Sequence, residues 1–214
     1  MPSSVRSDHA PSQLSQLMTL TCRGELAHPL SRANQLVLTI SAIVCALVLA
    51  SIWGIAAGSS SSTLALANSY KVPMVIFLSA LTALPAGLVA LRLANARLAA
   101  SDLVTAFATS IFSGTLVLAT LAPLVAIYYH TSSRAGVPLA LGSVFVALGT
   151  ATLLFARAVK RKLGDEQRIA SLIPVIILVA LFSAALMQFV ALASPIIGHT
   201  GTVFDGGFDS VFGR

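Results

Sequence analysis

Hydrophobic residues gather in five long runs separated by short polar breaks. The runs cover roughly 35–57, 72–93, 103–128, 137–157 and 169–194, and each is nearly free of charged residues. A helix needs about 20 apolar residues to cross a hydrocarbon core about 30 Å thick. Backbone groups in lipid find no water, so they are expected to bond within helices. The pattern therefore predicts an all-α fold, a polytopic membrane bundle with five transmembrane helices.

The runs divide the chain into three parts. Residues 1–34 are mostly polar and rich in Ser, Pro and Gln, which is typical of a flexible arm. Residues 35–198 form the five-helix transmembrane domain, and residues 199–214 form a short Phe-rich tail. In the break between the second and third runs, Ser101-Asp102 suits a helix N-cap, and a shallow interfacial helix is possible over residues 92–100.

Composition supports a membrane protein. The 214 residues are 57% hydrophobic and 9% charged, with a net charge of +6, whereas soluble domains carry about 25% charged residues. There are too few charges to cover a water-exposed globule of this size. The basic balance alone could suggest nucleic-acid binding, but the Lys and Arg residues flank the spans and are held at the membrane, so we expect no nucleic-acid partner.

The positions of the Lys and Arg residues predict the orientation. Three precede the first run, two separate the second from the third, and five separate the fourth from the fifth. The opposite side receives three. Since Lys and Arg are enriched in cytoplasmic loops, the N-terminus is expected in the cytoplasm and the C-terminus outside a bacterial inner membrane. The strongest topology determinants are Arg157, Lys160, Arg161, Lys162 and Arg168.

Aromatic residues fall near the predicted outer ends of the runs. Trp53, Tyr70, Tyr128 and Tyr129 all lie there. Because amphipathic rings favour the headgroup level of a membrane, the four predict an aromatic belt on the outer side. The cysteines, Cys22 and Cys45, lie in the arm and in the first run, so a disulfide between them is not expected.

Small residues and prolines within the runs predict how the helices pack. Lipid gives no hydrophobic drive for helix association, so backbones approach where side chains are small. The helix-packing candidates are Ala42, Ala46, Ala50 and Gly54, which continue to Gly58 at a spacing of four, then Ser110 and Gly114, and the amide of Gln188, which we interpret as buried in the fifth span. Proline removes a backbone bond, so Pro85, Pro123 and Pro174 are kink candidates.

Candidate chemistry is sparse. No Asp, Glu, Lys, Arg or His lies near the middle of a run, although proton relays and ion-coupled carriers depend on such residues. Ser113, in FSGT, has no base at membrane depth that would make it a nucleophile. His130, His199, Asp205 and Asp209 match no metal-ligand spacing. We therefore predict no catalytic, cofactor-binding or metal-binding residue and no enzymatic activity.

The C-terminal tail, TVFDGGFDSVFGR, repeats Phe204, Phe208 and Phe212 at a spacing of four. A helix here would present an apolar edge to the outer headgroups, or the tail could insert into a partner. Both interpretations make the tail an interaction element.

Three stretches resemble a family of uncharacterised bacterial five-span integral membrane proteins, loosely comparable to Yip-type proteins. They are KVPMVIFLSALTALPAG, LVTAFATSIFSGTLVLATLAPL and SAALMQFVALASPIIGHTG. Within them the matching pieces are Lys71-Val72-Pro73, Ala122-Pro123, Gln188, Pro195 and Gly198. An Arg that the family carries between the Gln and the Pro is missing here, and so is the Asp-Leu-Tyr-Gly-Pro type motif of Yip proteins. The resemblance covers about residues 71–200 and implies a five-span fold without enzymatic activity.

Two functions remain open from the sequence. The leading hypothesis is a non-enzymatic membrane protein that acts as a scaffold or accessory subunit, with other membrane subunits and the lipid bilayer as partners. The alternative is an uncoupled channel or carrier for a small neutral or apolar solute, which would use Pro85, Pro174 and Gln188.

Overall fold

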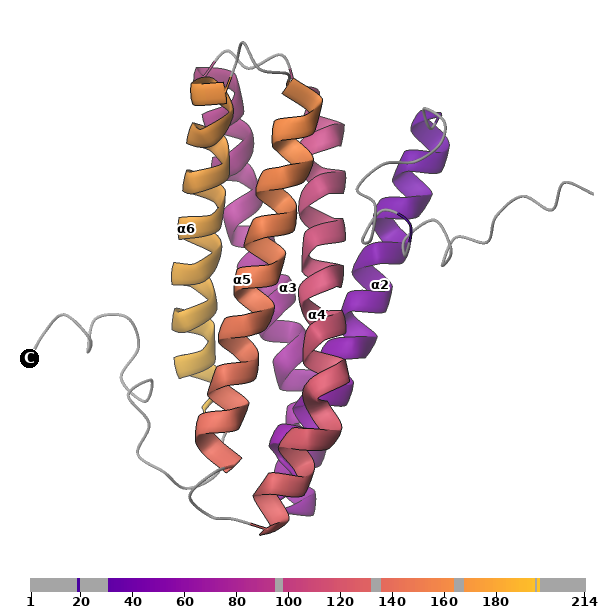
Figure 1. Ribbon diagram of the computed structural model, residues 1–214, viewed down its shortest axis with the longest axis vertical. Helices are drawn as coiled ribbons and strands as arrows, with labels where there is room; N and C mark the ends of the chain where they lie inside the picture. The colour runs from indigo at the N-terminus through magenta and orange to yellow at the C-terminus, as the bar shows by residue number, and fades with distance from the viewer. Residues whose placement is uncertain are drawn as a thin grey trace, which may run out of the picture.

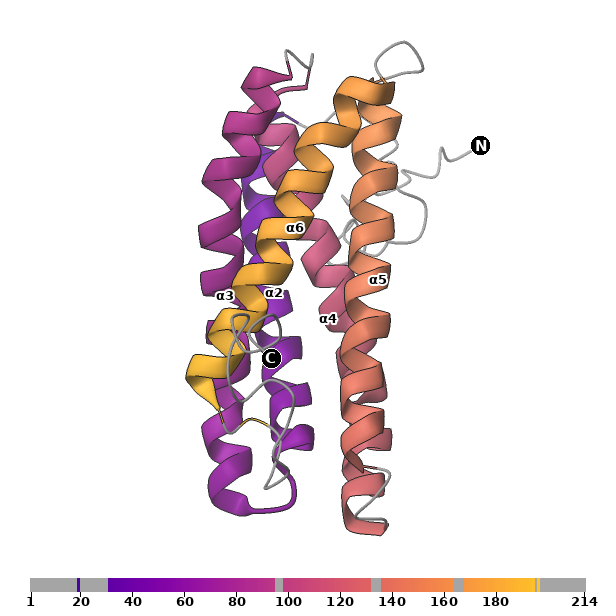
Figure 2. The same cartoon turned by 90° about the vertical axis from the view of Figure 1, so that its left-hand side faces the viewer.

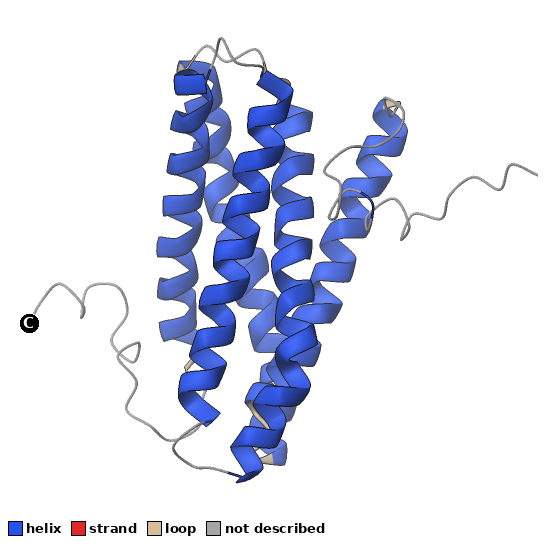
Figure 3. Cartoon of the chain, viewed as in Figure 1, coloured by secondary structure: helices blue, strands red, loops and turns tan. Residues whose placement is uncertain are grey.

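The computed structural model describes residues 31–94, 98–131, 136–163 and 168–194, together with Thr19 and Ile196. The described part is helical throughout, apart from short turns, and contains no strand (Figure 3). Its long helices are α2 (Arg32–Ala57), α3 (Ser62–Leu93), α4 (Ala100–Thr131), α5 (Gly136–Leu163) and α6 (Arg168–Ala193). All five are long and apolar enough to cross a membrane. The predicted all-α membrane bundle is therefore confirmed.

The first two helices begin earlier than the hydrophobic pattern indicates. Ser31 caps α2, since its side chain accepts a hydrogen bond from the Asn34 amide at 3.3 Å. Ser61 caps α3 in the same way through the amide of Leu64. The polar break between the first two runs therefore ends at Ser61, and α3 begins at Ser62. A Ser side chain at this position satisfies an amide that the first helical turn leaves unpaired, so both starts have a local cause.

The break before α4 differs from the prediction. The Asp102 amide donates to the Ala99 carbonyl at 3.0 Å, so Ser101 and Asp102 lie in the first helical turn rather than at the cap. The proposed interfacial helix over residues 92–100 is also wrong for its described part, because Arg92 and Leu93 complete α3 and the next described residues, Leu98 and Ala99, are not helical. Six residues, 94–99, separate the two helices along the chain.

The helices alternate in direction, so their ends gather at two levels (Figures 1 and 2). We call one level the basic end; there α2, α4 and α6 begin and α3 and α5 finish. The other level is the far end. Helix α2 packs against α4 and α3, α4 packs against α5, and α3 packs against α6, while α5 and α6 contact each other less. Helices α3 and α4, although consecutive, are hardly in contact.

The closest approach in the bundle joins α2 to α3 at the far end. A Cβ atom on Gly54 would lie 2.3 Å from the Asn68 carbonyl oxygen, and one on Gly58 would lie 2.7 Å from the backbone of Ala65. Any side chain at Gly54 would therefore clash with backbone. Glycine at both positions lets the two helices meet, as expected for membrane helices that pack by van der Waals contact.

Toward the basic end, the small residues of α2 that precede Gly54 at a spacing of four contact α4 instead of α3. Ala42 and Ala46 are buried against Ala108 and Phe112 of α4, and Ala50 joins a second cluster nearer the far end. The row thus lies at contacts with two helices of the same chain, first α4 and then α3.

Two further contacts rest on glycine. A Cβ on Gly114 of α4 would lie 3.0 Å from the carbonyl oxygen of Ala147 on α5, and Ser110, one turn earlier, is also buried. A Cβ on Gly87 of α3 would lie 2.4 Å from the Leu178 side chain of α6. Each strongly packed helix pair other than α2–α4 therefore has a glycine at its contact.

Aromatic rings fill the core in the basic half. The Phe107 ring of α4 meets Phe155 of α5 and Phe182 of α6, with centroids 5.6 and 5.5 Å apart and edge-to-face geometry, an arrangement that aromatic quadrupoles favour. Through Phe107, α4 thus contacts both α5 and α6.

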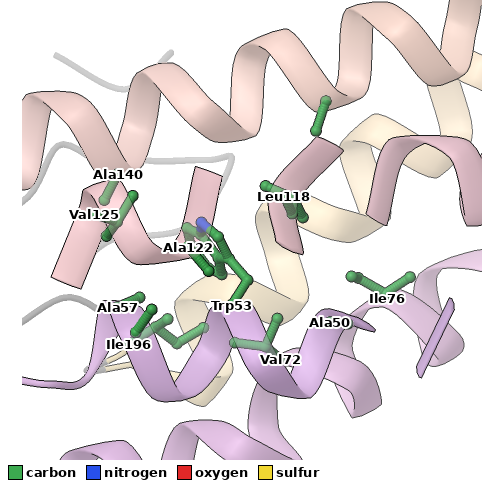
Figure 4. Close-up of a cluster of buried hydrophobic side chains, with 12 residues drawn as sticks. Ala50, Trp53, Ala57, Val72, Ile76, Leu118, Ala122, Val125, Ala140 and Ile196 are labelled. Atoms are coloured by element: carbon green, nitrogen blue, oxygen red, sulfur yellow. The ribbon is translucent and has the colours of Figure 1, made fainter. Parts of the chain in front are cut away.

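Trp53 fills the core in the far half. It is 3% exposed, lies among Val72, Leu118 and Ala122 (Figure 4), and donates its indole N–H to the Ser143 hydroxyl at 3.0 Å. Its assignment to an aromatic belt at the headgroups is therefore wrong. The hydrophobic run placed Trp53 near the end of its helix but could not show that its side chain points into the bundle. Tyr70 and Tyr128, by contrast, are exposed.

The kink candidates Pro85, Pro123 and Pro174 lie inside α3, α4 and α6, and Pro73 also lies inside α3 because that helix begins early. Each helix continues past its proline. Kinking at these positions stays a prediction.

The Gly54 contact yields a stability prediction. Gly54→Ala places a methyl group within the radius of a backbone oxygen, and overpacking of this kind typically costs about 1–3 kcal/mol. We expect the free energy of unfolding, measured in detergent micelles, to fall by that amount. Gly142→Ala is the matched control, because nothing lies within 4 Å of a Cβ at Gly142, and it should cause no loss. Equal stability of the two variants would contradict the contact.

Candidate functional site

A polar network at the basic end joins three helices. The carboxylate of Asp102, at the start of α4, forms an ion pair with the Lys162 ammonium at the end of α5. The same carboxylate oxygen accepts a hydrogen bond from the Gln35 amide of α2 at 3.0 Å. Asp102 is the sole acidic residue among those the structure describes. Its charge is therefore used to hold α2 and α5 to α4.

Hydroxyl groups extend this network along α2 and α4. The Gln35 amide also donates to the Thr105 hydroxyl at 3.1 Å, and the hydroxyls of Thr39 and Thr105 are 2.9 Å apart. Thr39 and Thr105 bond in turn to carbonyls one turn back in their own helices. The network is half exposed, with Lys162 and Asp102 at 45% and 30%, so it lies at the level where water can solvate charge.

The basic residues predicted as topology determinants occupy the last turns of α5 and the first turn of α6. Lys162 points to Asp102, whereas Arg157, Lys160 and Arg161 are exposed. Arg32 and Arg92 lie at the same end and are also exposed, while Lys71 lies in the opposite half of α3. The described residues of the predicted cytoplasmic set thus share one end of the bundle.

A second polar site lies at the far end, at Asn68 of α3. The residue is fully buried, and its side-chain amide donates to the Ile196 carbonyl at 2.6 Å. Its Oδ1 atom is also buried and has no hydrogen-bond partner within the described ranges. Buried polar atoms are nearly always paired, so one bond here fixes the segment after α6 and one acceptor is left open.

The remaining buried hydroxyls bond to their own helices. Ser79, Ser110 and Ser143 each donate to a carbonyl three or four residues earlier, at 2.6–2.7 Å. The Ser113 hydroxyl donates to the Thr109 carbonyl at 2.8 Å. Each of these hydroxyls thus donates within its own helix, and the Ser143 oxygen also accepts from Trp53 of α2.

Gln188 does not lie where the sequence pattern indicates. We interpreted it as the most strongly buried polar group, yet its side chain is exposed on α6. A single uninterrupted apolar run carries no information on which face turns inward, and α6 is apolar on all sides. Asn68 and Ser143 are the buried polar groups that contact other segments.

Several predicted residues lie outside the described residues. They include the N-terminal arm before Ser31 apart from Thr19, and the candidates of the tail, Phe204, Phe208 and Phe212. His199, Asp205 and Asp209 lie there too. His130 is exposed near the end of α4, and no group of three or more possible metal ligands occurs in the described ranges.

Sequence reasoning missed Asn68 and the role of Asp102, but each left a signal. Asn68 ends the stretch LALAN, just before the second run. A helix expected to start at Ser62 would have included it. Asp102 stands beside a run and near a basic cluster, and charge pairing was the available clue.

Comparison of the chain with protein-family models, curated proteins and solved structures found no match. The resemblance to five-span Yip-type proteins therefore stays a prediction, and the function is argued from the structure alone.

The Asp102 network yields a prediction on stability. Asp102→Ala removes a half-exposed ion pair and one hydrogen bond, which together contribute about 1 kcal/mol. The free energy of unfolding should fall by that amount, and Asp102→Asn, which keeps an acceptor for Gln35, should recover part of it. Ser101→Ala is the control, because the network uses its backbone carbonyl and not its side chain. If Asp102→Ala and this control had the same free energy of unfolding, the network would not hold the three helices together.

Asn68 yields a prediction on local dynamics. Asn68→Ala removes one hydrogen bond worth about 1 kcal/mol, so amide hydrogen exchange in the last turns of α6 should speed up about fivefold. Ser69→Ala, at the neighbouring position, should leave that exchange unchanged, because the Ser69 hydroxyl bonds to Leu66 within α3. Unchanged exchange in both variants would show that Asn68 does not hold this end.

Proposed function

We propose that this multi-pass membrane protein is non-enzymatic and serves as a scaffold or accessory subunit of a larger membrane assembly. The proposal rests chiefly on the outward face of α2. Seven large apolar side chains there are 42–61% exposed and follow the helix from its first turn to its last: Leu36, Val37, Ile40, Val44, Val48, Ile52 and Ile55.

The composition of this face suits a protein partner. Six of the seven residues are Val or Ile, whose side chains have one strongly preferred rotamer in a helix. They lose little freedom when another helix packs on them, and association in lipid depends on such packing because hydrophobic drive is absent. A stiff, continuous apolar face is thus favourable for a partner helix.

The position of α2 leaves this face accessible. In its basic half, α2 is buried against α4, with Leu38, Ala42 and Ala46 at the contact. Helix α3 packs there against α6 instead, and Figure 1 shows the first half of α2 at the edge of the bundle. The Asp102 network holds α2 in this position, so a partner would meet a fixed surface.

The channel or carrier alternative gains no such support. It would use Pro85, Pro174 and Gln188 around one path. Pro174 is fully buried, whereas Pro85 and Gln188 are exposed on different helices, so the three do not share a surface.

The orientation belongs to the same proposal. With Arg32, Arg92 and the cations of α5 at one end, the positive-inside rule supports a bacterial inner-membrane protein whose basic end and N-terminus face the cytoplasm. The partner would then contact α2 across the whole membrane.

Site-specific cross-linking tests the proposal. A photoreactive amino acid at Val44 or Val48, in the full chain expressed in its host membrane, should give one protein adduct of the same mass at both positions. The matched control is Leu153, an exposed residue of α5 at 60%, which should give no such adduct. Native mass spectrometry of the gently extracted protein should show the same partner. Lipid adducts alone at Val44 and Val48, with a solitary chain in the mass spectrum, would refute it.

A further inference from the structure

The outward face of α5 carries a combination of features that α2 lacks. Arg157 and Lys160 are exposed in its last turns, and Phe145, Val146 and Leu153 are exposed before them. Successive members of this set are separated by one to seven residues in a helical pattern, which keeps them on one side of the helix. The buried residues Ser143, Ala147, Phe155 and Val159 form the opposite side.

Two glycines leave this face without side chains at its middle. Gly142 and Gly149 are exposed, and nothing lies within 4 Å of a Cβ built on either. Glycine in a helix interior costs about 1 kcal/mol relative to alanine. At Gly54 and Gly114 a close backbone contact explains the glycine, whereas at Gly149 no described residue does. Around Gly149 the face therefore presents backbone without a side chain, between the exposed side chains of Leu153, Val146 and Phe145, and we call this stretch the trough.

The two cations differ from their neighbour in how they are used. Lys162 is paired with Asp102, the one described acid. Arg157 and Lys160 form no ion pair with any described residue and point to the same side as the trough. By charge complementarity, the basic end of this face would bind an anion. The trough beside it would contact an apolar chain.

We propose that the outward face of α5 binds one anionic phospholipid. Its phosphate is held by Arg157 and Lys160, and an acyl chain lies along Leu153 and over Gly149. Arginine suits phosphate oxygens because its planar guanidinium donates two hydrogen bonds at once.

The dimensions of the site match one leaflet. From Arg157 to Phe145 is twelve residues, or about 18 Å at 1.5 Å per residue. Half of a hydrocarbon core about 30 Å thick is about 15 Å. An acyl chain whose headgroup meets Arg157 would thus end near Phe145. A free phosphate would use the cations but not the trough, because it has no apolar part.

Native mass spectrometry of the full chain, extracted in mild detergent and mixed with equal amounts of phosphatidylglycerol and phosphatidylcholine of the same acyl chains, tests this. The wild-type chain should retain one phosphatidylglycerol in preference. In R157Q/K160Q the retention should weaken about thirtyfold, since each basic residue near an anionic lipid surface contributes about 1 kcal/mol, or about fivefold. The control R32Q/R92Q removes two exposed cations at the same end and should retain the lipid.

Gly149→Leu tests the trough separately. The open space around Gly149 admits a side chain without a clash, so the variant should fold, keep both cations and retain less phosphatidylglycerol. Equal loss in R157Q/K160Q and R32Q/R92Q would reduce the effect to general surface charge and overturn the proposal. Undiminished retention in Gly149→Leu would also overturn it, as would a wild-type dimer that this variant converts to monomer, because a second copy would then cover the face.

Discussion

The contact of Gly54 with the Asn68 carbonyl determines much of the arrangement at the far end. Lipid supplies no hydrophobic force between helices, so α2 and α3 associate by meeting backbone to backbone. With the two helices this close, Asn68 turns its side chain to the segment after α6. Trp53, one residue before Gly54, points into the core and reaches Ser143 of α5. One glycine thus permits contacts that involve three helices and the segment after α6.

The two ends of the bundle are held by different chemistry because they combine charge and burial differently. Asn68 is fully buried, and a neutral amide can occupy such a site at a smaller desolvation cost than a charge. Asp102 and Lys162 are partly exposed, so water reaches the ion pair with which they join α4 to α5. Between the two levels, edge-to-face rings around Phe107 and back-bonded hydroxyls fill the interior.

The sequence was sufficient for the number and approximate extent of the helices, because a long apolar run has one stable form in lipid. It was not sufficient to show which side chains point into the bundle. Trp53 and Gln188 lie in helices that are apolar on most sides. The hydrophobic runs therefore indicated where along its helix each residue lies, but not whether its side chain points into the bundle. The start of α3 was missed for a related reason: STLALANSY is too polar to resemble a span, and its helical form depends on the Ser61 cap and on the contact with Gly54.

The outward faces of α2 and α5 differ in ways that a uniform lipid environment does not require. Both are apolar and both end near the basic level, yet one is built from Val and Ile and the other from glycines bordered by larger residues. Stiff branched side chains present a fixed surface that another helix can match. The trough lies beside two cations that form no ion pair with any described residue, which suits a flexible chain with an anionic head. If lipid merely filled both surfaces, the exposed glycines of α5 would carry a cost in helix stability without a compensating contact. The asymmetry therefore supports a division of the bundle surface, with α2 facing a protein and α5 facing a bound lipid.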